Sequence, residues 1–206
     1  MMIKKVPKAT LRRYPIYLKA LRERLSQGDK KISSFELSKM TNVKAATIRR
    51  DFTFISTHGR QGFGYDVAEL IELFSSKLGK NFDTKIIMIG MGNLGKALSN
   101  YNAWEYGVGD IGCAFDIAPE QVFNSKIPVY HLDDLEEKIP TNCTVAILTG
   151  SKNLQNTVDR LILCGIKGII DCTHQHFTVP DDIKVKYVDV VSMIQEIVFE
   201  TNMTKN

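Results

Sequence analysis

The sequence predicts an α/β protein in two parts, and three observations carry that prediction. An apolar run at residues 86–89 leads directly into the turn Gly90-Met91-Gly92-Asn93-Leu94-Gly95, and a helical pattern follows it. Strand and helix patterns alternate after this turn, whereas the residues before it have helix-turn-helix spacing. We therefore expect a winged-helix domain at residues 1–80, a Rossmann domain with a doubly wound parallel sheet at residues 81–188, and a C-terminal helix at residues 189–206.

Composition limits the class of protein. Hydrophobic residues make up 44% of the chain and charged residues 24%, which is ordinary for a globular protein that can bury a core. No apolar run approaches the roughly 18 to 20 residues of a membrane helix, and the chain begins without a signal-peptide core. We expect a cytoplasmic protein without a membrane partner. The four cysteines are widely spaced and lack a Cys-x-x-Cys pattern, which is typical of buried free thiols.

Charge is distributed unevenly along the chain, whose net charge is +4. Residues 1–80 carry 17 Lys and Arg against 7 Asp and Glu, a net charge of +10, whereas residues 81–206 carry 10 against 16, a net charge of −6. A basic N-terminal part joined to an acidic remainder indicates that the first part meets a polyanion. Nucleic acid is the first candidate, and an anionic membrane surface is the alternative.

The basic part contains the pattern of a helix-turn-helix. The segment Pro7-Lys8-Ala9-Thr10 leads into a first helix, which is expected to end before Gln27-Gly28-Asp29. A short second helix begins at a capping box formed by Ser33 and Glu36. A third helix is expected over residues 44–54. Three apolar residues occupy the positions at which the second and third helices would pack together: Leu37, Val43 and Ile48.

The third predicted helix is the candidate for reading DNA. Its exposed side carries polar and basic residues that suit insertion into a major groove. We assign four of them to DNA: Lys44, Thr47, Arg49 and Arg50. A helical cluster with an ordinary solvated basic face is the alternative.

The glycine-rich residues 57–65 fit a β-hairpin, the wing that follows a helix-turn-helix. Arg60 lies at the expected tip, where an arginine can enter a minor groove, and we include its neighbour Gln61 in the DNA-binding set. An ordinary surface turn is the alternative. An amphipathic helix at residues 66–78 then leads to a short linker.

Each glycine of the turn at residues 90–95 has a task in dinucleotide binding. Gly90 permits the sharp bend, Gly92 lets the backbone approach a pyrophosphate, and Gly95 lets helix and strand pack closely. Asn93 and Leu94 complete the turn, where the free N–H groups and the helix dipole face the anion. A vestigial Rossmann scaffold and an ordinary glycine turn are the alternatives.

Asp116 supports a dinucleotide site. It ends a second apolar strand and lies 21 residues after Gly95. A carboxylate at this position can accept hydrogen bonds from a ribose diol and would repel a 2′-phosphate. The sequence therefore predicts NAD(H) as the cofactor, in preference to NADP(H).

The remaining residues continue the alternation. Strands are expected at residues 127–131, 144–149, 168–172 and 185–188, and helices at residues 133–139 and 153–164. The final helix, from residue 189 to about 201, is apolar on more than one side. This favours burial against a second subunit, with packing on its own domain as the alternative.

The residues resemble one family closely, the Rex redox-sensing transcriptional repressors. Matching segments occur in order along nearly the whole chain: Pro7-Lys8-Ala9-Thr10-Leu11, Ser33-Ser34-x-Glu36-Leu37, Ile48-Arg49-Arg50-Asp51, Gly62-x-Gly64-Tyr65-Asp66-Val67, Gly92-Asn93-Leu94-Gly95, Ala114-Phe115-Asp116, Ala146-Ile147-Leu148-Thr149, Gly165-Ile166-Lys167-Gly168-Ile169 and Val188-Asp189. The resemblance implies a homodimer that exchanges its C-terminal helices and represses genes from a palindromic double-stranded DNA operator. It also implies that NADH favours a closed dimer that leaves the operator.

The resemblance also assigns individual residues. Tyr101 and Asp189 match family positions near the nicotinamide, and Lys19 matches a basic position that can pair with the acid. Thr149 ends a matching segment, and we include it in the cofactor site. NADH must have different affinities for the two dimer arrangements, because a ligand without such a difference shifts nothing.

The chain departs from the family pattern at two strand ends. Gly150-Ser151 replaces the usual Val-Pro, and residues 171–174 replace the usual Asn-Phe-Ala-Pro, so a divergent paralogue with an altered nucleotide response is one interpretation. If residues 168–177 stay extended, Cys172, His174 and His176 alternate onto one face, where they would suit zinc. Three candidate ligands on one strand do not close a site, so we assign no metal.

Two other functions compete with a repressor. An NAD-dependent oxidoreductase is disfavoured because residues 81–206 suffice for a nucleotide fold but leave no substrate domain, and no acid/base pair stands out. A DNA-binding protein with a vestigial pocket would bind its operator regardless of nucleotides. We expect a repressor without catalytic residues.

Overall fold

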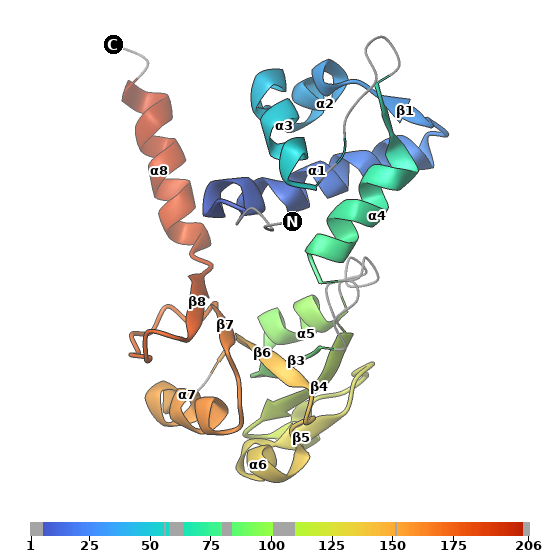
Figure 1. Ribbon diagram of the computed structural model, residues 1–206. Coiled ribbons are helices and arrows are strands. Elements are labelled where there is room, and N and C mark those ends of the chain that lie inside the picture. The colour runs from blue at the N-terminus through green and yellow to red at the C-terminus, as the bar shows by residue number, and fades with distance from the viewer. Residues whose placement is uncertain are drawn as a thin grey trace. The chain divides into compact units, whose positions relative to one another are not determined.

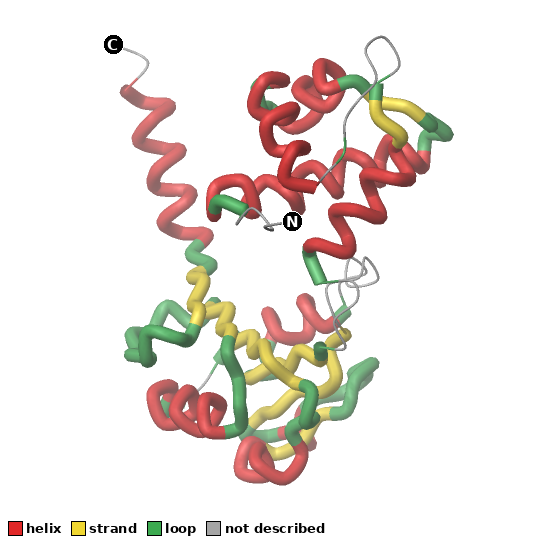
Figure 2. Tube along the Cα trace, viewed as in Figure 1, coloured by secondary structure: helices red, strands yellow, loops and turns green. Residues whose placement is uncertain are grey.

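Figure 1 shows a computed structural model of the chain, which describes residues 6–55, 57, 64–79, 84–100, 110–150 and 152–203. The chain divides into two compact units, Met1–Asn81 and Phe82–Asn206. Figure 2 shows that the first unit is mainly helical and that the second alternates strands with helices. The predicted α/β class is confirmed. The division of the second unit into a Rossmann domain at residues 81–188 and a separate C-terminal helix at residues 189–206 stays a prediction.

The first unit contains a helix-turn-helix. Its described elements are α1 (Lys8–Ser26), β1 (Lys31–Ile32), α2 (Ser34–Thr41), α3 (Ala45–Phe52), a 3₁₀ turn (Thr53–Ile55), β2 (Tyr65–Asp66) and α4 (Val67–Lys77). The predicted capping box starts α2, because the Glu36 N–H donates to Ser33 Oγ at 3.1 Å and the Ser33 N–H donates to Glu36 Oε2 at 2.8 Å. Asn42 ends α2 in the left-handed conformation, with φ of 54°, which Asn tolerates.

Strands β1 and β2 form a short antiparallel pair that the sequence pattern did not predict. Two residues in each strand are too few for a period-2 pattern to be recognised. Gly64 precedes β2 with φ of +69°, and a Cβ there would lie 2.6 Å from the Ile32 carbonyl oxygen, so only glycine fits beside β1. The predicted tip of the wing, with Arg60 and Gln61, lies outside the described residues.

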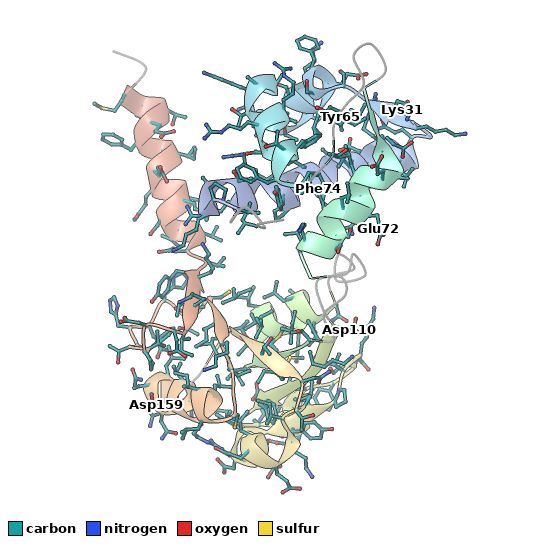
Figure 3. All side chains as sticks on the ribbon, viewed as in Figure 1. Lys31, Tyr65, Glu72, Phe74, Asp110 and Asp159 are labelled. Carbon is teal, nitrogen blue, oxygen red and sulfur yellow. The ribbon has the colours of Figure 1, made fainter. Side chains whose placement is uncertain are left out.

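Aromatic rings fill the core of the first unit. Tyr14 of α1 and Phe74 of α4 have ring centroids 4.9 Å apart, and the ring centroid of Phe52 of α3 lies 5.5 Å from that of Phe74. Figure 3 labels Phe74 on α4. Burying rings of this size stabilises a domain by about 1.5 to 3 kcal/mol each. α1, α3 and α4 therefore share one core.

The second unit is a six-stranded parallel sheet in the order β5-β4-β3-β6-β7-β8. Its strands are β3 (Lys85–Ile89), β4 (Asp110–Asp116), β5 (Val129–His131), β6 (Cys143–Leu148), β7 (Gly168–Asp171) and β8 (Lys184–Tyr187). Its helices include α5 (Asn93–Ser99), α6 (Leu135–Lys138), α7 (Leu154–Leu163) and α8 (Val190–Met203), with 3₁₀ turns at Pro119–Gln121 and Leu132–Asp134. The strand order confirms the predicted doubly wound Rossmann sheet.

The central strand β3 is buried on both faces. Ile87 and Ile89 join the core under α6 and α7, whereas Ile86 and Met88 join the core on the face that includes Leu98 of α5. A strand covered on both sides reads as a continuous apolar run, as the sequence showed. The turn that follows β3 is therefore fixed by helices on both sides of the sheet.

Helix α8 differs from the other helices of the second unit because none of its residues is buried. Eight large apolar side chains on it are more than half exposed: Val190, Val191, Met193, Ile194, Ile197, Val198, Phe199 and Met203. The alternative that α8 is buried on its own domain is therefore wrong, because a single copy of the chain leaves the whole helix exposed. None of the helices in the described part of the chain combines the length and apolar character needed to span a membrane.

Candidate functional site

The turn after β3 has the geometry that the glycine pattern predicts. Gly90 has φ of +91°, and a Cβ on it would lie 2.8 Å from the backbone of Gly150. A Cβ on Gly95 would lie 2.2 Å from the Gly90 carbonyl oxygen, which confirms close packing of α5 against the turn. A Cβ on Gly92 would meet nothing within 4 Å. Gly90 and Gly95 are thus required by packing, whereas Gly92 leaves open space next to the backbone.

Asp116 lies at the end of β4, beside this turn. Its Oδ2 accepts a hydrogen bond from the Met91 N–H at 2.5 Å, and its Oδ1 accepts one from the Ala118 N–H at 2.9 Å. An ionised carboxylate has about four acceptor positions. Two backbone donors therefore hold the half-buried side chain and leave about two positions, which is what the two hydroxyls of a ribose diol need.

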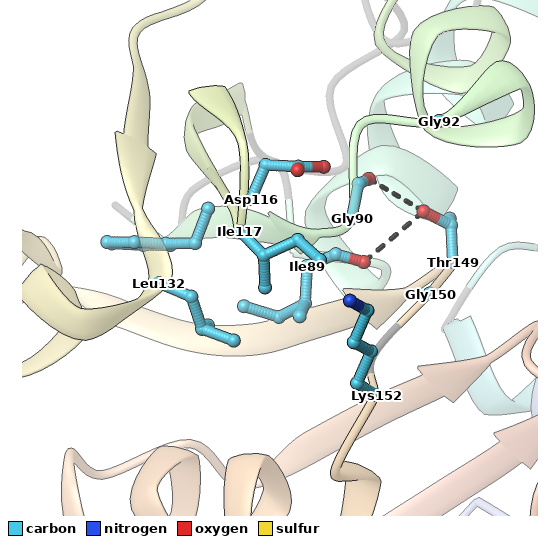
Figure 4. A pocket seen from close by; sticks show the side chains of 10 residues that line it. Ile89, Gly90, Gly92, Asp116, Ile117, Leu132, Thr149, Gly150 and Lys152 are labelled. Carbon is cyan, nitrogen blue, oxygen red and sulfur yellow. Dashed lines mark hydrogen bonds between the residues drawn. The ribbon is translucent and has the colours of Figure 1, made fainter. Parts of the chain in front are cut away.

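A cavity of about 340 Å³ connects the glycine turn to Asp116. Figure 4 shows Asp116 and Leu132 on one side of it and Gly90, Thr149 and Lys152 on the other. Ten residues line it: Ile89, Gly90, Gly92, Phe115, Asp116, Ile117, Leu132, Thr149, Gly150 and Lys152. This volume and a mainly apolar wall with a few polar groups are typical of a small-molecule site.

The cavity lies at the carboxyl ends of β3, β4 and β6. In a doubly wound sheet, ligands bind where the strand order reverses, which here is between β3 and β6. Thr149 ties these two strands together, because its hydroxyl donates to the Gly90 carbonyl at 2.7 Å and its N–H donates to the Ile89 carbonyl at 2.8 Å. Thr149 thus lies in the predicted site and holds the Gly90 turn.

The residues present fit an adenine dinucleotide. Ile117 and Leu132 offer apolar surface to a base, Asp116 offers acceptors to a ribose, and the backbone at Gly92 leaves room for a phosphate. Asn93 and Leu94 open α5, and both are exposed. Tyr101 lies outside the described residues.

Asp189 precedes α8 and does not line the cavity. Its Oδ1 accepts from the Ser192 N–H at 3.0 Å and its Oδ2 from the Ser192 hydroxyl at 2.5 Å. His174 Nδ1 lies 3.6 Å from Asp189 Oδ1. The two Ser192 hydrogen bonds and the nearby His174 hold the pKa of Asp189 below its usual value.

Residues 168–177 do not stay extended, which was the condition for Cys172, His174 and His176 to share one face. β7 ends at Asp171, and His174 has φ of +58°, so Cys172, His174 and His176 do not alternate along an extended strand. Among the described residues, no three His, Cys, Asp or Glu side chains come close enough to hold a metal ion. His174 instead faces Asp189.

The second candidate site is the outer face of α3. Lys44 is the N-cap residue of α3, and Lys44, Arg49 and Arg50 are exposed, whereas Thr47 is partly buried. Arg49 Nη1 donates to Ser34 Oγ at 2.9 Å, which links α3 to the start of α2. Ile48 and Phe52 on the opposite face are buried in the core. The helix therefore presents its basic side to solvent.

The sequence patterns missed several residues that line the cavity. Ile117 directly follows β4, Leu132 directly follows β5, and Lys152 lies shortly after β6. Each lies just beyond the carboxyl end of a strand, where ligands bind in such sheets. This position is the signal that could have identified them.

Known proteins similar to this chain cover both units. Residues 5–53 match the family described as "Putative DNA-binding protein N-terminus", and residues 81–174 match the family described as "CoA binding domain". The redox-sensing transcriptional repressor Rex of Anoxybacillus flavithermus is 40% identical over 198 residues, which cover 95% of this chain and 93% of the relative. The Rex repressor of Geobacillus kaustophilus is 39% identical over the same shares of both chains.

Solved structures are similar over nearly the whole chain. The protein RSP in complex with NAD⁺ and operator DNA has a TM-score of 0.85 and 33% identity, covering 98% of this chain and 95% of that one. RSP in complex with NADH has a TM-score of 0.81 and 32% identity, covering 97% and 96%. A further structure describes RSP as a Rex-family repressor.

Proposed function

Since this chain belongs to the Rex family of redox-sensing transcriptional repressors, we propose that it binds operator DNA and releases it when NADH occupies the second unit. The observation that carries the proposal is the cavity between the Gly90 turn and Asp116, in the same chain as a basic helix-turn-helix. A nucleotide can shift operator binding only by the difference between its affinities for the two states.

The proposed nucleotide is NAD(H). Asp116 accepts the ribose hydroxyls, and the segment Gly90-Met91-Gly92-Asn93-Leu94-Gly95 holds the pyrophosphate at the start of α5. Tyr101, Thr149 and Asp189 complete the proposed set of nucleotide-responsive residues. The carboxylate of Asp116 disfavours a 2′-phosphate, which selects NAD(H) over NADP(H).

The proposed DNA contacts come from α3 and the wing. Lys44, Thr47, Arg49 and Arg50 enter the major groove, and the wing adds Arg60 and Gln61. Because several of these residues meet phosphates, operator affinity falls steeply as the salt concentration rises.

The proposed assembly is a homodimer on a palindromic operator. The support is α8, whose eight exposed large apolar side chains would cost stability in water unless another surface covers them. In the proposed dimer, each α8 packs on the partner subunit, so that the helices are exchanged. Two copies related by a two-fold axis present two α3 helices to two half-sites.

The direct test is operator binding by fluorescence anisotropy at fixed salt. The probe is a duplex selected by the protein from a random-sequence pool, and NADH and NAD⁺ are titrated separately. We expect release by NADH at a concentration at least tenfold below that required for NAD⁺. Equal release by both nucleotides, or no release by either, would contradict redox sensing and point to a changed or lost signal at the Gly150-Ser151 segment.

The proposal assigns no catalytic residue to this chain. Residues 82–206 provide one nucleotide fold, and the ionisable side chains that line the cavity, Asp116 and Lys152, do not form a hydrogen-bonded acid/base pair among the described contacts. Incubation of the protein and NADH with small aldehydes and ketones should leave the absorbance of NADH unchanged. Steady oxidation of NADH would favour an oxidoreductase.

A further inference from the structure

Asp51 is a buried acid on the helix proposed to read DNA. It is 1% exposed, and its carboxylate receives four hydrogen bonds. Thr10 Oγ1 donates to Oδ1 at 2.9 Å and Tyr17 OH donates to Oδ2 at 2.6 Å. Arg13 donates from Nη2 to Oδ1 at 2.7 Å and from Nε to Oδ2 at 2.6 Å. All acceptor positions of the carboxylate are therefore in use.

Every one of these donors belongs to α1. Thr10, Arg13 and Tyr17 are spaced three and four residues apart, so they lie on one face of α1. Burial opposes ionisation of Asp51, but the hydrogen bonds from Arg13, Tyr17 and Thr10 outweigh it and hold the pKa of the carboxyl below its usual value. Arg13 and Asp51 therefore stay charged, and the hydrogen bonds between them are directional.

The apolar contacts of α3 do not fix its rotation to the same degree. The helix has eight residues, and its buried apolar side chains, Ile48 and Phe52, lie one turn apart in a single line. Apolar packing is non-directional, so these two side chains restrain rotation of the short helix about its own axis less than hydrogen bonds would. A helix with its side chains has a radius of about 5 to 6 Å, so a roll of about 20° moves the side-chain ends by about 2 Å.

We propose that Asp51 is a positioning residue for operator recognition, because its bonds to Thr10, Arg13 and Tyr17 fix the rotation of α3 and keep its outward side chains in register with the bases. This inference rests on the proposed entry of α3 into the major groove. Hydrogen bonds to base edges need donor and acceptor within a few tenths of an ångström of their ideal separation, whereas phosphate attraction tolerates displacement. Loss of the cluster therefore reduces selectivity between sequences more than it reduces affinity for DNA in general.

The main test replaces the whole cluster with apolar side chains of similar size: Thr10→Val, Arg13→Met, Tyr17→Phe and Asp51→Leu. The net charge stays the same, and no polar partner is left unpaired. Replacing a buried ion pair in this way is often neutral or stabilising, so we expect a thermal midpoint close to that of the wild type. We expect the ratio of affinities for the selected duplex and for a scrambled duplex to fall at least tenfold. A folded variant with the wild-type ratio would overturn the proposal.

A second variant covers the case in which the fourfold variant does not fold. Tyr17→Phe removes one hydroxyl and keeps the Arg13–Asp51 pair, and we expect a two- to threefold loss of selectivity. An unchanged ratio in this folded variant would overturn the proposal. Arg13→Lys keeps the charge but not the two-pronged geometry, so it should lose selectivity as well; full selectivity would show that charge alone suffices and would also count against the proposal.

The matched control is the ion pair of Lys85 and Asp110 in the second unit, whose charged atoms are 3.1 Å apart and whose side chains are 35% and 80% exposed. The charge-neutral replacement Lys85→Met with Asp110→Leu should keep the wild-type selectivity. If the wild-type protein itself does not distinguish the selected duplex from the scrambled one, the proposed function fails. If it does and the cluster variants behave like it, only the positioning role fails.

Discussion

Asp51 and Asp116 are held in opposite ways in the two units. Asp51 on α3 is fully buried, and four hydrogen bonds from three side chains of α1 use all its acceptor positions. Asp116 at the end of β4 is half-buried beside a cavity, and it receives two hydrogen bonds from the backbone N–H groups of Met91 and Ala118. The same residue type is saturated in one unit and left partly open in the other.

The difference separates a structural role from a ligand-binding role. A carboxylate with no free acceptor position cannot bind a hydroxyl, but it can fix one helix against another. A carboxylate held by backbone amides keeps its place whatever the neighbouring side chains are, and it still has positions for a ligand. The two aspartates should therefore respond to substitution through different measurements.

The largest effect is expected for Asp51→Ala. This variant leaves the Arg13 guanidinium near the core without its partner, and breaking a buried pair in this way costs about 3 to 5 kcal/mol. Urea denaturation should show this loss in the free energy of unfolding. NADH affinity of the protein that remains folded should stay at the wild-type value, since Asp51 belongs to the other unit. A loss below about 1 kcal/mol would contradict the view that the pair is tightly coupled.

The glycine turn offers a matched pair of variants with the next largest effect. Gly95→Ala places a methyl group 2.2 Å from the Gly90 carbonyl oxygen, so the backbone must move, at a cost of about 3 kcal/mol. Gly92→Ala meets no neighbouring atom within 4 Å and should fold normally. Its methyl group would instead occupy space next to the cavity and weaken NADH binding about tenfold, as measured by isothermal calorimetry. Equal stability losses in the two variants would show that the space at Gly92 is not available.

Asp116→Ala should mainly weaken NADH binding, whereas Asp51→Ala should mainly lower the free energy of unfolding. We expect NADH to bind about 10- to 100-fold more weakly, a loss of about 1.4 to 2.7 kcal/mol, because two charge-assisted hydrogen bonds to the ribose disappear. Relative affinity for NADPH should rise, since the repelling carboxylate is gone. Calorimetric titration of both nucleotides measures this. Unchanged NADH affinity would remove Asp116 from the ribose site.

Local sequence patterns were sufficient for the features that depend on short spacing. The capping box of Ser33 and Glu36, the turn at Gly90 and the acid at Asp116 all follow from residues near one another or from the regular alternation of strands and helices. The parallel arrangement of the strands follows from the same alternation, because parallel strands need crossover connections, which are usually helices.

The features that escaped prediction depend on contacts between distant residues. Asp51 lies 41 residues from Thr10, and no local spacing marks a pair so far apart. The pairing of β1 with β2 joins two segments of two residues each, and a Cβ at Gly64 would collide with β1. The apolar surface of α8 was visible in the sequence, and the structure leaves it exposed. In the proposed dimer a second copy covers this surface, and residue spacing does not specify those contacts.

The smallest effect is expected for a third carboxylate, Glu136, which has an arginine partner as Asp51 does but is exposed. Glu136 of α6 receives two hydrogen bonds from Arg160 of α7, at 2.6 and 2.5 Å, which is the same two-pronged contact that Arg13 makes with Asp51. These bonds lower the pKa of Glu136 to about 2 from its ordinary value of 4.5. Its side chain is 52% exposed, however, so solvent screens the pair and it contributes only about 0.5 kcal/mol.

The pH dependence tests this contribution. Because the folded-state pKa is lowered, the contribution is present above about pH 4.5 and is lost as the pH falls towards 2. Glu136→Gln should therefore be slightly less stable than the wild type at pH 6, and the difference in thermal midpoint should vanish near pH 2. Glu137→Gln is the matched control, since Glu137 contacts the adjacent Lys138 and makes no described bond to α7. A pH-independent difference for Glu136→Gln would mean that the loss comes from packing of α6. In that case, the comparison of Glu136 with Asp51 would no longer show that burial decides how much an arginine–carboxylate pair contributes to stability.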